Sequence, residues 1–248
     1  MDAGSLWMAG AFAAVALVFA SVGQAGASGY LAVMAFADLA PVTMKATALA
    51  LNLVVAAICL GQFARRGHLT WASAWPFAVL SFPFSLAGGA VHLPETVYLP
   101  LVGAVLILSA LQMARAAWRG RAQAAEPPRT PPFAAALLVG AAIGFLSGTT
   151  GTGGGVFLAP AILALNWATV RQTAAISAVF NLTNSAAALI GAHGAWSGLP
   201  PALPLWLVAV AIGGAAGAFV GARHLPEVGM RLTLAGLLLL SGLKLLVG

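Results

Sequence analysis

The stretch SGTTGTGGGVFLAPAILAL, from Ser147 to Leu165, decides which architecture this chain can adopt. It follows an apolar run that begins at Phe133, and it consists of a glycine-rich break and a short apolar segment. A helix of about ten residues rises only ~15 Å, half of the roughly 30 Å of hydrocarbon in a bilayer. The stretch therefore predicts a half-helix inside a membrane. The region from Leu6 to Leu39 repeats the pattern around the break VGQAGASG, Val22 to Gly29.

The composition indicates that lipid is the solvent of this chain. Of 248 residues, 61% are hydrophobic and 6% are charged, whereas about a quarter of the residues of a soluble domain are charged. The basic residues that make the net charge +6 lie between apolar runs and form no continuous stripe, so nucleic-acid binding is not expected. Six further runs are long enough to span a bilayer: Met44 to Phe63, Trp75 to Val91, Val97 to Trp118, Arg171 to Ala192, Leu203 to Arg223 and Leu232 to Val247.

The chain divides into two related halves. A shift of 126 positions pairs Gly29 with Gly155, and it pairs the string T-x-K-x-T at Thr43 to Thr47 with T-x-R-x-T at Thr169 to Thr173. The polar segment RGRAQAAEPPRTPP, Arg119 to Pro132, cannot continue a buried helix because of its prolines and charges. We therefore predict a first membrane repeat at residues 1–118, a linker at 119–132 and a second membrane repeat at 133–248.

The basic residues distinguish two topologies, because Lys and Arg concentrate at cytoplasmic ends of membrane spans. If each glycine-broken region crosses the membrane completely, the basic residues divide 7 to 4 between the faces. If each region instead dips in and returns as a re-entrant hairpin, only Lys45 and Lys244 lie opposite the other nine. The hairpin topology is therefore preferred. Each half then adds three transmembrane helices, which makes the halves inverted repeats with both termini outside and the linker cytoplasmic.

The starts of the two half-helices, predicted at Tyr30 and Val156, are candidate anion-binding groups. A helix N-terminus carries unpaired N–H groups and a positive dipole end, and both favour an anion. Inverted halves would bring the two starts together near the membrane midplane, where polar residues of the following spans could complete a pocket. The candidate substrate-binding residues are Gly26, Ser28, Gly29, Tyr30, Asn52, Thr152, Gly153, Gly154, Gly155, Val156, Ser177, Asn181 and Asn184.

Each part of this interpretation has a structural alternative. The glycines could serve only close helix packing, and the polar side chains could serve only contacts between helices. Lys45 and Arg171 are gate charges for an anion in one interpretation and interfacial snorkelling residues in the other. Gly213, Gly217 and Gly221 form small-xxx-small steps that are typical of a tight helix contact.

The sequence contains little that indicates an enzyme active site or a metal site. Cys59 is the single cysteine and the four histidines form no pair at ligand spacing, so neither a metal site nor a cofactor is expected. The string GASG, Gly26 to Gly29, is similar to the nucleophile motif of rhomboid proteases, with His193 as a conceivable base. A serine nucleophile needs a base within hydrogen-bond reach. An intramembrane serine protease is therefore only a distant alternative to a non-enzymatic protein.

The string GTGGGVFLAP, Gly151 to Pro160, with the run T-x-R-x-T-A-A-x-S at Thr169 to Ser177, resembles the sulfite exporter TauE/SafE family of bacterial permeases. The resemblance covers nearly the whole chain, although GASG replaces the glycine run in the first half and Met34 stands where Pro160 has its counterpart. It implies a multi-pass protein of the bacterial inner membrane that moves sulfite, an organosulfonate or a related small anion, often outward.

Our hypothesis for the mechanism is alternating access around a midplane pocket. The same sequence also allows three alternative functions: a passive anion channel, an organic-acid carrier and a membrane scaffold. The oligomeric state is left open, with a homodimer as one option.

Overall fold

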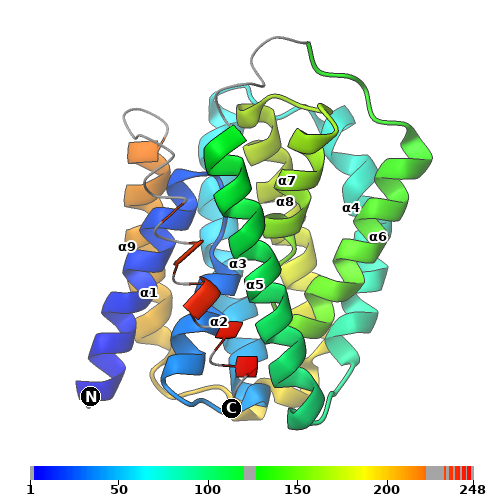
Figure 1. Cartoon of the computed structure of the whole chain (residues 1–248). Coiled ribbons are helices and arrows are strands. Elements are labelled where there is room, and N and C mark those ends of the chain that lie inside the picture. Colours follow the sequence, from blue (N-terminus) through cyan, green and yellow to red (C-terminus); the bar gives the residue numbers. More distant parts are fainter. Residues whose placement is uncertain are drawn as a thin grey trace.

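The structure of the chain, a computed structural model, is a bundle of α-helices joined by short connections (Figure 1). It describes residues 3–119 and 127–221, together with separate positions between 232 and 246. The described elements are α1 (Ala3–Ser21), α2 (Ala27–Phe36), α3 (Pro41–Arg65), α4 (Trp71–Ala90), α5 (Glu95–Arg119), α6 (Phe133–Thr150), α7 (Gly155–Ala164), α8 (Val170–Gly191), the 3-10 helix η1 (His193–Gly198) and α9 (Leu203–Gly221).

The predicted all-α membrane class is confirmed. Six of the described helices are long and apolar enough to cross a membrane, namely α1, α3, α5, α6, α8 and α9. Five predicted spans coincide with α3, α4, α5, α8 and α9. The span predicted at Leu232 to Val247 and part of the predicted linker, residues 120–126, lie outside the continuously described residues.

Both glycine breaks begin a half-helix in the same way. Helices α2 and α7 have ten residues each, so each rises ~15 Å. Gly26 precedes α2 with a φ of 96°, and Gly154 precedes α7 with a φ of 82°. Glycine adopts this left-handed conformation at no steric cost. The first half therefore builds the same helix start without a glycine run. Its helix begins at Ala27, so the start predicted at Tyr30 is wrong by three residues.

The register that relates the two halves differs from the ungapped shift of 126. Gly29 is the third residue of α2, whereas Gly155 is the first residue of α7. Likewise, Lys45 is the fifth residue of α3, whereas Arg171 is the second residue of α8. The ungapped pairing is therefore wrong at these positions. The physical reason is that the connections before and after the half-helices differ in length between the halves.

Helices α1 and α2 pack on each other as a helical hairpin. Tyr30 near the start of α2 packs edge-on against Phe12 in the middle of α1, with 5.7 Å between ring centroids. Trp206 at the start of α9 donates a hydrogen bond of 3.1 Å from Nε1 to the Ser5 carbonyl at the start of α1. Thr43 at the start of α3 donates to the carbonyl of Gly198, which ends η1 just before α9. The hairpin thus begins and ends at the face where α3 starts (Figure 1).

Helices α6 and α4, and likewise helices α9 and α1, pack with their backbones in contact, because glycines remove the side chains between them. A β-carbon on Gly144 of α6 would lie 2.7 Å from the Ser81 carbonyl oxygen of α4. In the other pair, Gly213 and Gly217 of α9 lie against the backbone of α1, which confirms the tight contact predicted for these two glycines. The facing residues on the partner helices are Phe77, Ser81 and Ser85 for Gly140, Gly144 and Gly148, and Ala13 and Leu17 for Gly213 and Gly217.

The first helix of each half packs on a helix of the other half. Helix α1 packs on α9 in the second half, as α6 packs on α4 in the first half. Helix α3 packs on α9, as α8 packs on α4, and α3 and α8 pack on each other. Figure 1 shows that α1 and α6, the first helices of the two halves, run in opposite directions. Helices α3 and α8 are therefore central to the bundle.

We expect Gly144→Ala to destabilise the protein by about 1–3 kcal/mol, because the added methyl group forces α6 away from the α4 backbone. Gly10→Ala is the matched control, since no atom lies within 4 Å of a β-carbon at that helical position. The midpoint of thermal unfolding in detergent measures the difference. Equal midpoints for the two variants would contradict the backbone contact.

Candidate functional site

Two asparagines hold the starts of the half-helices. Asn52 of α3 accepts a hydrogen bond of 2.9 Å through Oδ1 from the backbone N–H of Ala27, the first residue of α2. Asn181 of α8 accepts one of 2.8 Å from the backbone N–H of Gly155, the first residue of α7. The first N–H groups of a helix have no partner within the helix. Each half therefore satisfies one of these groups with an amide from the helix that follows.

The two helix starts meet at a shared centre. Gly153, in the break of the second half, lies against the amide of Asn52 in the first half, and a β-carbon there would meet Asn52 Nδ2. The same β-carbon would lie 3.2 Å from Asn181 Oδ1. Asn52 Nδ2 also donates a hydrogen bond of 2.8 Å to Ser185 Oγ on α8. We call Asn52, Gly153, Asn181 and Ser185 the amide centre. The asparagines are 1% and 2% exposed, so the centre is closed to solvent in this state.

The amide centre offers mainly hydrogen-bond donors. In both asparagines Oδ1 accepts a backbone N–H, which leaves Nδ2 as the donating end of the side chain. The Asn52 amide donates to Ser185 Oγ, so the serine proton is free to point onward. Among the described residues, none of the buried polar side chains is a carboxylate. Donors without a fixed negative charge suit an anion.

Further buried polar atoms, most of them on α2, α3 and α8, have no hydrogen-bond partner. Leaving such an atom unpaired costs about 1–3 kcal/mol, so their concentration on these elements calls for a functional explanation. Ser177, Asn181 and Asn184 share one face of α8, as their spacing predicts. The unpartnered atoms are both amide atoms of Asn184, the hydroxyls of Ser28, Thr47, Ser147, Thr173 and Ser177, and Gln112 Oε1 on α5.

Comparison with known proteins agrees with this architecture. Residues 7–245 match the family described as sulfite exporter TauE/SafE. The chain belongs to the TauE/SafE family. It is also similar to the probable membrane transporter protein y4hK of Sinorhizobium fredii (strain NBRC 101917 / NGR234), with 56% identity over 246 residues that cover 99% of this chain and 100% of the relative. No solved structure matches the chain.

A TauE/SafE protein is a membrane transporter and not an enzyme. The arrangement of Ser28 and His193 also does not support the serine-protease alternative. The hydroxyl of Ser28 is buried in α2 without a hydrogen-bond partner. His193 lies in η1, beyond the far end of α8. A serine without a base in reach is not an activated nucleophile. The residues that the structure describes also contain no group of His, Cys, Asp and Glu that could hold a metal ion.

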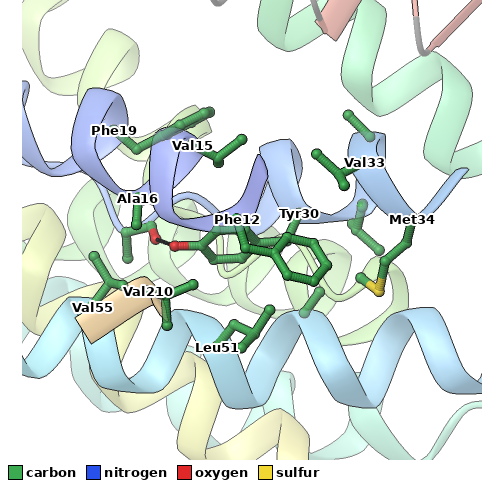
Figure 2. Close-up of a cluster of buried hydrophobic side chains, with 14 of the residues drawn as sticks. Phe12, Val15, Ala16, Phe19, Tyr30, Val33, Met34, Leu51, Val55 and Val210 are labelled. Carbon is green, nitrogen blue, oxygen red and sulfur yellow. Dashed lines mark hydrogen bonds between the residues drawn. The ribbon is translucent and has the colours of Figure 1, made fainter. Parts of the chain in front are cut away.

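Several predicted site residues make packing contacts or local hydrogen bonds near the two breaks. The Tyr30 hydroxyl donates to the Ala25 carbonyl at 2.9 Å, and its ring lies in the apolar cluster around Phe12 (Figure 2). Gly29 lets α2 approach Val15 and Phe19 of α1. Thr152 pairs with the hydroxyl of Thr150 at 3.0 Å, and Val156 packs beside Val105 of α5. These residues position the two breaks through packing and local hydrogen bonds.

The two predicted gate charges lie in different environments. Lys45 is buried and its ammonium donates three hydrogen bonds to backbone carbonyls at the end of α4. Arg171 is exposed at the start of α8, next to the capping box that Thr169 and Gln172 form. The paired motif in the sequence therefore does not produce a pair of equivalent charges.

A cavity of about 530 Å³ lies at the face of the linker, between the starts of α4, α6 and α8. Trp75, Phe77, Phe133 and Trp167 line it together with polar side chains, among them Arg129 and Gln172. The sequence analysis missed this cavity. Its walls come from four separate segments, and no local pattern predicts how such segments meet.

We expect Gly155→Ala to destabilise the protein by about 1–3 kcal/mol, because a β-carbon at this position would lie 2.7 Å from Asn181 Cγ and displace the amide. The added cost should shrink when Asn181 is already alanine. Thermal unfolding of the two single variants and the double variant measures this coupling. Gly61→Ala is the control, since no atom lies within 4 Å of that site. Additive effects of the two substitutions would argue against direct contact.

Proposed function

We propose that this TauE/SafE transporter exports a small sulfur-containing anion, such as sulfite or an organosulfonate, by alternating access between two inverted halves. The observation that carries the proposal is the amide centre, where two half-helix starts and two asparagine amides come together. Each helix start contributes about half a unit of positive charge. The oxygens of a sulfonate or sulfite group accept hydrogen bonds from several directions. Such a group therefore matches a cluster of donors that converge on one centre.

A site built from dipoles suits a carrier, because transport needs release as well as binding. A lysine or arginine in contact with the anion at the centre would hold it more strongly than neutral amides and hydroxyls do. The unpartnered atoms of Ser177 and Asn184 lie on the same helix face as Asn181. They are proposed to contact the substrate together with the amide centre.

The direction of transport is proposed from the distribution of charge. Helices α3 and α5 end at the face of the linker, and α8 begins there. This face carries the described arginines Arg65, Arg66, Arg115, Arg129 and Arg171, and basic ends prefer the cytoplasm. The cavity at this face then serves as the inner vestibule. A negative-inside potential favours anion efflux by about 2.3 kcal/mol per charge per 100 mV, so export needs no coupling ion.

Alternating access is proposed because the halves exchange packing partners and their first helices run in opposite directions. Such an arrangement permits two states in which the halves swap conformations around a fixed site. A passive anion channel and an organic-acid carrier remain the competing functions.

Flux in proteoliposomes distinguishes these functions. Sulfite, sulfoacetate, taurine and sulfate are supplied as competing substrates. Saturable exchange with counterflow supports a carrier, whereas ohmic flux without counterflow supports a channel. Preference for carboxylates over the sulfur anions would favour an organic-acid carrier, and absence of flux for every anion would overturn the proposal.

We expect Asn181→Asp to reduce anion flux by more than about tenfold while the protein remains folded. Aspartate retains an oxygen that accepts the Gly155 N–H bond, but it adds a negative charge to the proposed site. Asn166→Asp is the matched control, because it adds the same charge at the linker face, outside the amide centre. Wild-type flux in Asn181→Asp would exclude the amide centre as the anion site.

A further inference from the structure

The two halves carry different side chains at equivalent positions beside the amide centre. Gly151 begins the second break, and a β-carbon there would lie 3.2 Å from Lys45 Cα on α3. Gly23 holds the matching place in the first break, where a β-carbon would lie 3.0 Å from Ala174 Cα on α8. Both glycines have positive φ, 80° and 77°. Each break thus rests on a helix of the other half, against a lysine in one case and an alanine in the other.

Lys45 and Ala174 are also equivalent in their sequence separation from the asparagine on the same helix. Lys45 precedes Asn52 by seven residues, and Ala174 precedes Asn181 by seven residues. Seven residues are two helical turns, so each pair shares one helix face with a separation of ~10.5 Å along the axis. Lys45 therefore lies on the face of α3 that meets the amide centre, toward the end where α3 starts.

The charge of Lys45 has an unusual set of partners. Its ammonium donates to the carbonyls of Gly88 at 3.2 Å, Gly89 at 2.8 Å and Val91 at 3.0 Å, which lie at the C-terminal end of α4. These partial negative charges solvate the ammonium without neutralising it. Among the described residues, Lys45 is the one charged side chain that is buried. A buried cation without a carboxylate attracts an anion that comes within reach.

We propose that Lys45 is a charge-selective binding residue for the transported anion on the side of the amide centre where α3 starts. This inference rests on the proposed function. The flexible stem of lysine lets the ammonium move from the α4 carbonyls to an anion that leaves or approaches the centre from that side. Ala174 provides no charge on the linker side, so the two approaches bind the anion unequally. The residue selects anions by charge and favours a dianion over a monoanion.

The test compares two sulfonates in proteoliposomes, the dianion sulfoacetate and the monoanion methanesulfonate. In Lys45→Met, which keeps the apolar stem and removes the charge, we expect KM for sulfoacetate to rise about tenfold and KM for methanesulfonate to rise less, since Coulomb energy scales with the substrate charge. Lys45→Arg should keep the wild-type ratio of the two KM values. Arg65→Gln, which removes an exposed charge at the end of α3, is the control and should also keep that ratio.

The outcomes separate this inference from the proposed function. If the wild-type protein moves none of the anions, the proposed function fails. If it transports both sulfonates and Lys45→Met leaves the KM ratio unchanged, Lys45 only caps α4 and this inference alone is overturned. If Lys45→Met does not fold, the test is the shift in the thermal unfolding midpoint of the wild-type protein when each sulfonate is added. A larger stabilisation by sulfoacetate than by methanesulfonate at equal concentration supports the inference, and equal stabilisation overturns it.

Discussion

A helix that starts inside a membrane leaves backbone N–H groups without partners, and the rest of this structure depends on how those groups are satisfied. Asn52 and Asn181 supply the acceptors for α2 and α7, and each comes from the next long helix of its own half. The two acceptors must therefore lie where α3 and α8 pack on each other, at the centre of the bundle. The position of the candidate site follows from this requirement.

Glycine has two separate physical roles in the bundle. In the breaks, Gly26 and Gly154 provide the left-handed conformation from which a half-helix can begin. In α6 and α9, glycines such as Gly144 and Gly217 remove side chains so that helix backbones touch. Close backbone contact gives van der Waals packing between helices. This packing is needed because the hydrophobic effect does not drive helices together when lipid is the solvent. A glycine count alone does not separate the two roles, but the backbone φ and the neighbouring atoms do.

The two similar halves differ in the charge that they place beside the amide centre. Both halves present an amide to a half-helix start, which makes the neutral, donor-rich centre that we propose as the anion site. Beside that centre the halves diverge, with Lys45 on one side and Ala174 on the other. Similar local backbone arrangements in the two halves thus carry different charges. In the proposed mechanism, this asymmetry makes the affinity for the anion differ between the two faces.

Composition and local sequence pattern were sufficient to predict the membrane class, the two glycine breaks, the length of the half-helices and the resemblance to a transporter family. It also placed Asn52 and Asn181 among the candidate residues. Only the tertiary structure decided the register of the halves, the packing role of Tyr30, the carbonyl partners of Lys45 and the cavity at the linker face. These features depend on contacts such as that between Asn52 and Ser185, which lie 133 residues apart. Local pattern carries no information about which distant surfaces meet.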